Sequence, residues 1–312
     1  MNIREALQHA TTALAAAGSD EAALEAELLL AHALGTDRTH LYQRLPDELP
    51  PGAAAAFEAL LRRRLAHEPV PYIVGRKEFF GLEFEVSPAA IIPRPETETL
   101  VELVIAFVSE RGLATPRIAD VGVGCGAIAV ALAVSLPAGR HGLPAGRHGL
   151  PAGRHGLPRA EVIAVDISPD ALALARRNAE RHGVAGRIDF REGDLLAPRR
   201  GSVGGRASSR RVDVIAANLP YVRSADFEAG PPEIREHEPR LGLDGGPDGL
   251  RLIERLLRDA PACLAPGGAL FAEIGEEQGE AALSLARACF PQAQIEVRKD
   301  LSALDRVLVV QT

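Results

Sequence analysis

The chain has 312 residues, of which 46% are hydrophobic and 25% charged, so a wholly disordered chain is excluded and there is room for one large domain or two. No stretch approaches 18 uninterrupted apolar residues, and the first ten residues lack the basic-then-apolar order of a signal peptide, so we expect a cytoplasmic protein without membrane contact. The net charge of −7 disfavours nucleic acid as a partner, because phosphate backbones are bound mainly by Lys and Arg, and we expect no DNA substrate.

The N-terminal segment has the pattern of a helical domain. Apolar residues recur at helical spacing over residues 23–28 and again over 53–65, and Ser19 and Asp20 are placed to cap the first run. Three prolines lie between the two runs, as expected of a connection between helices. We therefore predict a small helical domain over residues 1–70, whose composition indicates no chemistry.

The next segment changes in character. Aromatic residues cluster around Gly81, the pattern of a short hairpin, and the segment ends in IIPRPETE at residues 91–98. We expect a β-hairpin linker over residues 71–95, followed by a helix from about Pro95 to Gly112.

After Gly112, strand-like and helix-like segments alternate, which predicts an α/β fold with a doubly wound, mostly parallel sheet over residues 96–312. The last two predicted strands have no helix between them, so one of them should run antiparallel. The predicted strands are 117–122, 162–167, 187–191, 212–217, 268–274, 293–298 and 306–311.

Two segments interrupt this alternation and are predicted to be inserted loops, at residues 136–158 and 197–211. The first holds the heptapeptide LPAGRHG three times in tandem, and the Pro and two Gly of every copy exclude a continuous helix. Together with Arg159, the two segments carry nine arginines and no acid, and without those arginines the chain would have 26 basic against 42 acidic residues. Nucleic acid would therefore bind only if these segments acted as basic arms.

Metal and disulfide chemistry have weak signals. The histidine of each heptapeptide copy recurs at seven-residue spacing, which is compatible with metal binding, but a flexible loop is a poor metal site and we expect none. Cys125, Cys263 and Cys289 are odd in number and far apart in the sequence, so we predict neither a disulfide nor zinc.

A glycine-rich turn follows the first strand of the predicted sheet, in the sequence IADVGVGCGAIA. Gly122, Gly124 and Gly126 alone are a weak signal, because glycines also serve ordinary tight turns. An acid at the end of the next strand, Asp166, strengthens it, since such a carboxylate binds ribose hydroxyls about 20 residues beyond the glycines. The separation from Gly126 is 40, and subtracting the 21 residues of the repeats leaves 19. The repeat is thus an insertion into a standard unit, and deleting two copies should leave activity intact.

The spacing of the glycines favours one cofactor. A nicotinamide site usually has Gly-x-Gly-x-x-Gly, which brings a helix N-terminus to the pyrophosphate. Here the pattern is Gly-x-Gly-x-Gly after Asp120, which favours S-adenosylmethionine, a cofactor without phosphate whose ammonium group Asp120 could attract. Asp194 is placed to accept a hydrogen bond from the adenine amino group with Leu195 against the ring, although a helix cap or solvated loop is the alternative for Asp194.

The strand at 212–217 runs into Asn218, Leu219, Pro220 and Tyr221, in the sequence VIAANLPYV. Taken alone, these residues are typical of an Asx turn and a packed rim residue at a strand end. In combination with the cofactor motif, they favour a substrate site that holds a nitrogen.

With these motifs placed, nearly the whole chain resembles the release factor glutamine methyltransferase family of protein N5-glutamine methyltransferases. The resemblance rests on the helical domain and on PYIVGRKEFFGLEFEV, IIPRPETETLVE, DVGVGCGAIAVALA, VIAVDIS, NLPY, LGLDGGPDGL, LAPGGALFAEIGEEQGE and DLSALDRVLVV. It implies methyl transfer from S-adenosylmethionine to the glutamine of the Gly-Gly-Gln motif in class I peptide chain release factors. It also implies that the helical domain and hairpin help to dock the release factor.

The resemblance assigns roles to individual residues. The cofactor would be contacted by Gly122, Val123, Gly124, Cys125, Gly126, Asp166, Leu195 and Asn218, and the substrate glutamine by Asn218, Leu219, Pro220 and Tyr221. Two departures stand out: Leu219 replaces the proline of the family's Asn-Pro-Pro-Tyr, and the two insertions are foreign to the family pattern. Leu219 keeps its backbone carbonyl and its extended bias before Pro220, and gives up only the ring that fixed φ.

Other functions share parts of this signal. An adenine-N6 methyltransferase must also methylate a nitrogen whose lone pair is delocalised, so similar residues would serve it. Such an enzyme must in addition hold a nucleic-acid backbone with positive charge. A ribosomal-protein glutamine methyltransferase and a non-catalytic docking module for the release factor are further alternatives. The complete cofactor motif argues against the docking module. For the assembly we expect a monomer.

Overall fold

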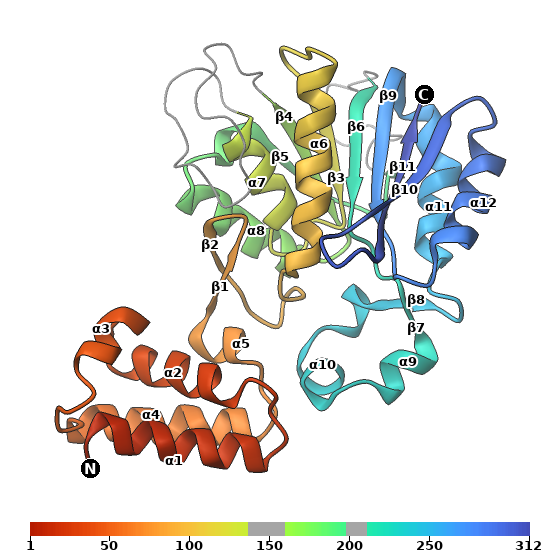
Figure 1. Ribbon diagram of the computed structural model, residues 1–312. Coiled ribbons are helices and arrows are strands. Elements are labelled where there is room, and N and C mark those ends of the chain that lie inside the picture. The colour runs from red at the N-terminus through yellow and green to blue at the C-terminus, as the bar shows by residue number, and fades with distance from the viewer. Residues whose placement is uncertain (137–159, 198–210) are drawn as a thin grey trace. The chain divides into compact units, whose positions relative to one another are not determined.

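The computed structural model describes residues 1–136, 160–197 and 211–312, and contacts divide them into two units (Figure 1). The first unit comprises Met1–Arg76 and Gly230–Glu238, and the second Lys77–Ala229 and Pro239–Thr312. The repeat histidines and almost all of both predicted insertions lie outside the described residues. The predicted boundaries near residues 70 and 95 stay predictions.

The first unit is helical and has its own apolar core. Its first helix starts with a capping box, in which the Asn2 side chain accepts from the N–H of Glu5 and the Glu5 side chain accepts from the N–H of Asn2, at 2.9 Å each. The helices are α1 (Ile3–Ala16), α2 (Ala22–Ala33), α3 (Arg38–Gln43), α4 (Pro51–Leu65), α5 (Val70–Val74) and α10 (Pro232–His237).

The predicted cap of the second helix is wrong. Helix α2 begins at Ala22, its N-cap is Glu21, and no side chain caps it. The Ser19 hydroxyl is instead engaged before the helix begins, accepting from the N–H of Glu21 at 3.3 Å and donating to Glu25 at 2.8 Å. The helix therefore starts later than Ser19 and Asp20 would place it.

The predicted hairpin is formed by β1 (Arg76–Phe79) and β2 (Leu82–Glu85). Its turn residues, Phe80 and Gly81, have φ of 53° and 73°, the left-handed conformation that a tight hairpin turn requires. Phe79 and Phe84 are buried and pack edge to face in the core of the second unit, with ring centroids 6.1 Å apart. The hairpin is thus anchored by its two aromatic side chains.

The second unit is built on a seven-stranded sheet in the order β10-β11-β9-β6-β3-β4-β5. The five strands from β9 to β5 are parallel, whereas β11 is antiparallel to both β9 and β10. The predicted doubly wound, mostly parallel sheet with one reversed strand is confirmed. The strands are β3 (Arg117–Val121), β4 (Glu161–Asp166), β5 (Ile188–Glu192), β6 (Val212–Ala217), β9 (Leu264–Glu273), β10 (Gln294–Lys299) and β11 (Asp305–Gln311).

Helices cover both faces of this sheet, as Figure 1 shows. One apolar cluster joins the sheet to α6 (Glu98–Glu110), α7 (Ala127–Ser135) and α8 (Pro169–Arg181). The other joins it to α11 (Arg251–Asp259) and α12 (Gly279–Cys289). The shorter elements are η1 (Pro95–Thr97), η2 (Ala185–Arg187), β7 (Val222–Arg223), α9 (Ser224–Ala229), η4 (Arg240–Gly242), β8 (Asp244–Gly246) and η5 (Ala260–Ala262).

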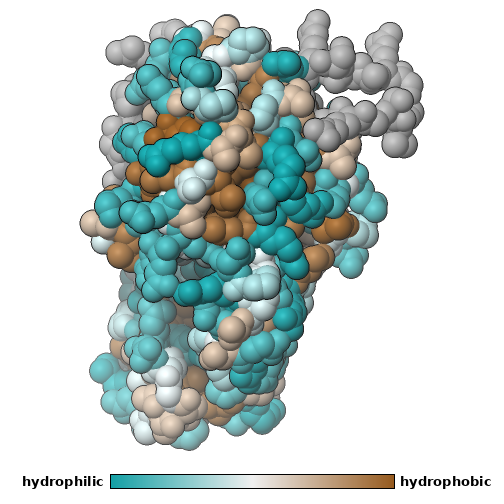
Figure 2. Space-filling model, turned by 90° about the vertical axis from the view of Figure 1, so that its right-hand side faces the viewer, coloured by the Kyte–Doolittle hydropathy of each residue, from teal (hydrophilic) through white to brown (hydrophobic). Residues whose placement is uncertain are grey.

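The surface mixes polar and apolar side chains. On the face drawn in Figure 2, hydrophilic residues surround smaller patches of hydrophobic ones. Among the described residues, Leu301 is the most exposed large apolar side chain, at 91% exposure. No helix within the three described ranges combines the length and the apolar character needed to cross a membrane.

Candidate active site

Four residues lie in a row along the carboxyl edge of four neighbouring parallel strands, because the strands are paired in register. Val121 pairs with Val165 on one side and with Ala217 on the other, and Ala217 pairs with Ala272. The residues that follow are Gly122, Asp166, Asn218 and Glu273. Ligands of doubly wound sheets bind beyond this edge, where the strand order reverses.

The first three of these four were predicted, and Glu273 was missed. Its signal is the one that identified Asp166: an acid that ends a buried apolar strand, here in LFAE.

The glycine turn after β3 has the conformation that only glycine adopts easily. Gly122, Gly124 and Gly126 have φ of 80°, 54° and 90°. A Cβ on Gly126 would lie 3.1 Å from the Cβ of Ala175, so this glycine also lets the turn pack closely on α8. The turn is fastened to the neighbouring strand, because the N–H groups of Gly122 and Val123 both donate to the Val165 carbonyl, at 2.8 and 3.0 Å.

Asp166 holds the same turn from the end of β4. Its Oδ2 accepts from the N–H of Gly124 and its Oδ1 from the N–H of Ser168, both at 2.9 Å. Burial raises the pKa of this carboxyl, and the hydrogen bonds from Ser168 and Gly124 oppose that rise. Each oxygen keeps a lone pair for a further donor. A ribose hydroxyl is a suitable donor.

Asp120, in β3, is fully buried, and within the described chain neither of its oxygens has a hydrogen-bond partner. Burial raises the pKa of its carboxyl to about 7, and the charge of Asp166 adds to the rise. An unpartnered buried carboxylate is costly unless a cation or donor approaches it. This feature, the three glycines and Asp166 together fit a cofactor that carries an ammonium group and a ribose.

Cys125, inside the glycine turn, is a buried free cysteine. Burial raises the pKa of its thiol to about 12, so it stays neutral and is a poor nucleophile. Its carbonyl accepts from Nδ2 of Asn178, at 2.9 Å, and the same Nδ2 donates to the Glu85 carbonyl, also at 2.9 Å. Oδ1 of Asn178 accepts from the N–H of Glu85 at 2.8 Å, so this buried side chain ties the turn to the hairpin.

Asn178 was not predicted. Its signal is a polar residue on the buried stripe of α8, among alanines and leucines.

Asp194 and Leu195 follow β5. Asp194 is exposed and pairs with Arg255 of α11 at 2.6 Å. Leu195 is buried and has a φ of 52°, unusual for a residue with a side chain. The predicted contacts of this pair with adenine stay predictions, and Asp194 would have to bind adenine alongside Arg255.

Asn218 is oriented by a neighbouring helix start. Its Nδ2 donates to Oγ1 of Thr97, the last residue of η1, at 3.0 Å. No hydrogen bond to its Oδ1 is found among the described residues, so this oxygen is the available acceptor. Thr97 is buried and was not predicted; sequence alone gives no signal that it meets Asn218.

The rest of the tetrapeptide packs against glycines of two other segments. Leu219 is buried against the turn, since a Cβ on Gly122 would lie 3.0 Å from its Cδ2. A Cβ on Gly245 would lie 2.6 Å from the Pro220 carbonyl oxygen, and one on Gly249 would overlap the carbonyl oxygen of residue 221. The glycines of LGLDGGPDGL therefore allow the backbone of this segment to lie in close contact with the backbone of the tetrapeptide.

Tyr221 is held at both ends. Its hydroxyl donates to Oε1 of Glu273 at 3.1 Å, and its carbonyl accepts from Nε2 of Gln278 at 2.9 Å. Burial, together with the charge of Glu273, raises the pKa of the Tyr221 hydroxyl, so it stays protonated and serves as a donor.

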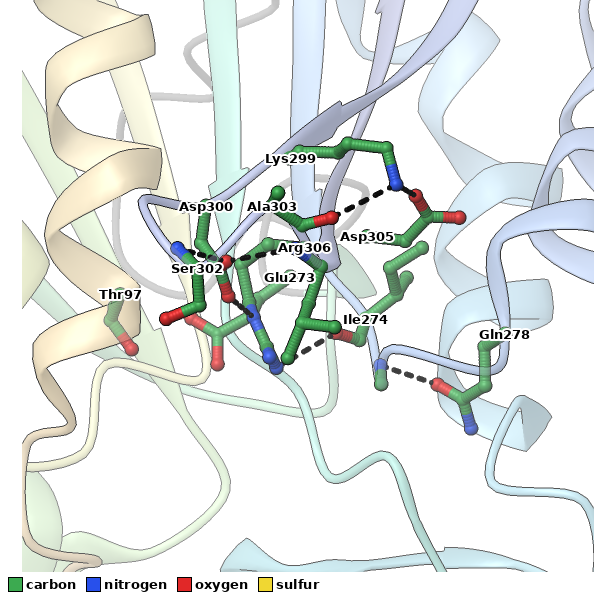
Figure 3. A network of polar contacts seen from close by, with 12 residues as sticks. Thr97, Glu273, Ile274, Gln278, Lys299, Asp300, Ser302, Ala303, Asp305 and Arg306 are labelled. Atoms are coloured by element: carbon green, nitrogen blue, oxygen red, sulfur yellow. Dashed lines mark hydrogen bonds and ion pairs between the residues drawn. The ribbon is translucent and has the colours of Figure 1, made fainter.

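Glu273 is itself surrounded by a polar network, drawn in Figure 3. Arg306 is buried nearby and is held by Asp300 at 3.0 Å and by the Ile274 carbonyl at 3.4 Å. Burial raises the pKa of Glu273, while the charge of Arg306 opposes the rise. Within the described ranges no group of three or more His, Cys, Asp or Glu side chains could hold a metal ion.

Comparisons with known proteins bear on this site. The family profile described as the PrmC N-terminal domain matches residues 5–75, and one described as a methyltransferase domain matches residues 140–237. The chain is 42% identical to the release factor glutamine methyltransferase of Moorella thermoacetica over 306 residues, 98% of this chain and 97% of that protein. It is also 42% identical to that of Cereibacter sphaeroides, over 99% of this chain and 98% of that protein. The chain is 41% identical to the release factor glutamine methyltransferase of Geobacter sulfurreducens, over 91% of this chain and 87% of that protein.

Proposed function

Because the chain belongs to the release factor glutamine methyltransferase family, we propose that it methylates the side-chain amide nitrogen (N5) of the glutamine in the Gly-Gly-Gln motif of class I peptide chain release factors. Membership confirms the predicted enzyme class, a protein-glutamine methyltransferase, and S-adenosylmethionine as its methyl donor. The substrate motif and the role of each residue belong to the proposal.

The observation that carries the proposal is the orientation of Asn218. Its NH2 group is engaged by Thr97 at 3.0 Å, so its Oδ1 is the side that can accept from a substrate. It follows β6 directly, beside the glycine turn of β3, its neighbour in the sheet. An acceptor for a substrate nitrogen thus lies next to the candidate cofactor site.

This arrangement suits the chemistry of a carboxamide. The nitrogen of an amide is a poor nucleophile because its lone pair is delocalised into the carbonyl. Two acceptors that take its two N–H hydrogens orient that lone pair for in-line attack, and positioning of this kind lowers the barrier. Asn218 Oδ1 is one acceptor and the backbone carbonyl of Leu219 is the natural second. Leucine supplies that carbonyl as well as proline does.

The cofactor would be held by residues 122–126, by Asp166 and by Asp120. When bound, it supplies a methyl group already activated by a sulfonium, so the protein needs no strong base beside the amide. Asp166 would accept from the ribose, and Asp120 would gain the cationic partner that it lacks. Asp194 and Leu195 would flank the adenine.

Tyr221 and Pro220 complete the substrate side. The Tyr221 ring, fixed through its hydroxyl and its carbonyl, would cover the planar amide and exclude water. Pro220 limits the flexibility of the turn. The helical first unit and the hairpin would help to dock the release factor, and we further propose that the enzyme is a cytoplasmic monomer.

Two other substrates share this chemistry. An adenine-N6 enzyme would use the same two acceptors, but the net charge of −7 is unfavourable for holding a nucleic-acid backbone. A ribosomal-protein glutamine is not distinguished by the two acceptors. The names of the similar proteins favour the release factor over both.

The test is incubation with labelled S-adenosylmethionine and four separate substrates: a class I release factor, its Gly-Gly-Ala variant, ribosomal protein and DNA. We expect label on the intact release factor only. Label on DNA or on ribosomal protein instead of the release factor, or equal label on the Gly-Gly-Ala variant, would reject the proposal.

A further inference from the structure

The loop between β9 and α12 closes on the side chain of Gln278. Its Oε1 accepts from the N–H of Gly275 at 2.8 Å, as Figure 3 shows, and its backbone N–H donates to the Gly275 carbonyl at 2.9 Å. The two residues thus bond to each other in both directions across a short turn. The carboxamide of Gln278 is held by the loop in which it lies, and its NH2 group is left for other partners.

The NH2 group of Gln278 bridges two further segments. It donates to the carbonyl of Tyr221 at 2.9 Å and to the carbonyl of Asp248 at 3.2 Å, which accounts for both N–H donors of a carboxamide. Three segments therefore meet at this one side chain: the end of the tetrapeptide, the loop between β8 and α11, and the loop between β9 and α12.

The partners of Gln278 allow its carboxamide only one orientation. A backbone carbonyl can only accept, and a backbone N–H can only donate. If the carboxamide were turned over, its oxygen would face two carbonyls and its NH2 group would face the N–H of Gly275, so all three hydrogen bonds would be lost. The hydrogen-bond network thus assigns the nitrogen to Tyr221 and Asp248.

Gly249 leaves room for this bridge. It has a φ of 75°, and a Cβ at this position would overlap both the Nε2 of Gln278 and the carbonyl oxygen of Tyr221. Any larger residue here would therefore push the donor and its acceptor apart. The close approach of the two loops and the hydrogen bond between Gln278 and Tyr221 depend on the same glycine.

Tyr221 is held at both ends from one short stretch of chain. Its hydroxyl donates to Glu273 at 3.1 Å, and its carbonyl accepts from Gln278 at 2.9 Å. The first bond fixes the tip of the ring, and the second fixes the backbone that carries the ring. A tyrosine that kept only the first of these bonds could still shift its backbone, and its ring would tilt.

We propose that Gln278 is a positioning residue: its NH2 group fixes the backbone of Tyr221 against the loop between β8 and α11, so that the Tyr221 ring stays over the substrate amide. This inference rests on the proposed function, which places that ring over the amide, and adds one residue to it. Gln278 is not a catalytic residue, since it acts through Tyr221. The glycine turn and Asp166 follow other strands, β3 and β4, so cofactor binding should not depend on Gln278.

Gln278→Glu tests the NH2 group with almost no change of shape. The carboxylate still accepts from the N–H of Gly275, but it cannot donate to the two carbonyls and is repelled by them. A negative charge is favourable at the start of α12, so this helix should not suffer. We expect the single-turnover methylation rate at saturating release factor to fall by about tenfold to 100-fold. The cofactor Kd, and the release factor concentration that gives half the maximal rate, should change little.

Gln278→Met is the second variant, because methionine keeps the length of the side chain without an N–H donor, and its rate should fall in the same range. Gln294→Met, at an exposed position of β10, is the matched control and should behave as wild type. A wild-type rate for either Gln278 variant overturns the proposal. A cofactor Kd that rises as much as the rate falls also overturns it, because the whole site would then have loosened.

A readout that needs no substrate separates this inference from the proposed function. The chain has only three tyrosines, Tyr42, Tyr72 and Tyr221, so labelling with 3-fluorotyrosine gives a fluorine NMR spectrum with few signals. The Tyr221 signal, identified by its loss in Tyr221→Phe, should shift or broaden in both Gln278 variants. The signals of Tyr42 and Tyr72, which belong to the first unit, should stay in place. If the wild-type protein methylates no release factor but this pattern holds, the function is wrong and the positioning of Tyr221 stands. An unchanged Tyr221 signal in the Gln278 variants overturns the positioning.

Discussion

Asp166, the last residue of β4, accepts a hydrogen bond from the backbone N–H of Gly124, in the turn after β3, at 2.9 Å. The sequence predicts these two residues as separate contacts to a cofactor. The structure joins them directly, so the acid stabilises the glycine turn and also presents its remaining lone pairs beside it. The shape of the turn and the proposed ribose contact therefore depend on one carboxylate.

Asp166→Ala should weaken S-adenosylmethionine binding by about tenfold to 100-fold, because hydrogen bonds to a charged group contribute about 1.5–3 kcal/mol. Isothermal titration of the cofactor measures the change, with circular dichroism as a check of folding. Ser168→Ala is the control: it removes the N-cap of α8, where Ser168 Oγ accepts from the N–H of Ala171 at 3.2 Å, and it leaves the carboxylate in place. Unchanged affinity in Asp166→Ala would show that the ribose assignment is wrong.

Asn218→Ala should remove most of the methylation activity while the protein still folds. The variant loses the proposed acceptor for the substrate amide and releases Thr97, and misplacement of a reacting group costs about 100-fold. Single-turnover methylation of a release factor gives the rate, and urea unfolding gives the stability. Turnover at the wild-type rate would exclude Asn218 from the amide clamp.

Leu219→Pro restores the proline that the family's tetrapeptide usually has, and it should retain methylation. The backbone carbonyl is unchanged, and in the described chain the N–H of Leu219 donates no hydrogen bond outside the regular elements. A small loss of stability is expected, since the Leu219 side chain is 3% exposed and packs against Gly122. Rates and unfolding midpoints of the two proteins decide the matter. An inactive but folded Leu219→Pro variant would show that the leucine side chain itself is needed.

Asn178→Ala should destabilise the second unit by about 3 kcal/mol or more, because it removes three hydrogen bonds from a buried side chain and leaves backbone groups unsatisfied. Urea unfolding measures this loss. Arg177→Ala is the matched control on the same helix, since its ion pair to Glu85 is half exposed and such pairs contribute about 0–1 kcal/mol. Equal losses in the two variants would contradict the role given to Asn178.

The elements were predictable where periodicity is strong. All seven strands of the sheet were placed within a few residues, and the helix expected from Pro95 to Gly112 is present as η1 and α6. The pair β7 and β8 was not predicted, because strands of two and three residues carry no period. The start of α2 was misplaced because Ser19 bonds to Glu21 and Glu25 instead of capping the helix.

The site was predictable one strand at a time. Asp166 and Asn218 stand out because each ends a buried strand, and Glu273 carried the same signal. The order of the strands in the sheet could not be predicted from the sequence. That order places β9 next to β6 and Glu273 beside Tyr221. Thr97 was harder still to predict, because its contact with Asn218 joins residues that are 121 positions apart in the sequence.

Asp120→Asn should make the protein more stable at alkaline pH and leave it unchanged in acid. Burial raises the pKa of this carboxyl to about 7 from an ordinary 3.8, so between these values the folded state binds a proton that the unfolded state has lost. The stability that this group contributes is therefore complete below 3.8 and is lost as the pH rises through about 7. Asparagine carries no charge at any pH, and it should gain about 1–3 kcal/mol over wild type at pH 8 and nothing near pH 4. Urea unfolding at several pH values measures the free energy of unfolding, and Asp189→Asn, at an exposed position, is the control. A difference in stability between Asp120→Asn and wild type that does not grow with pH would contradict the prediction. The affinity for S-adenosylmethionine should fall in Asp120→Asn, because the ammonium group of the bound cofactor would lose its charged partner.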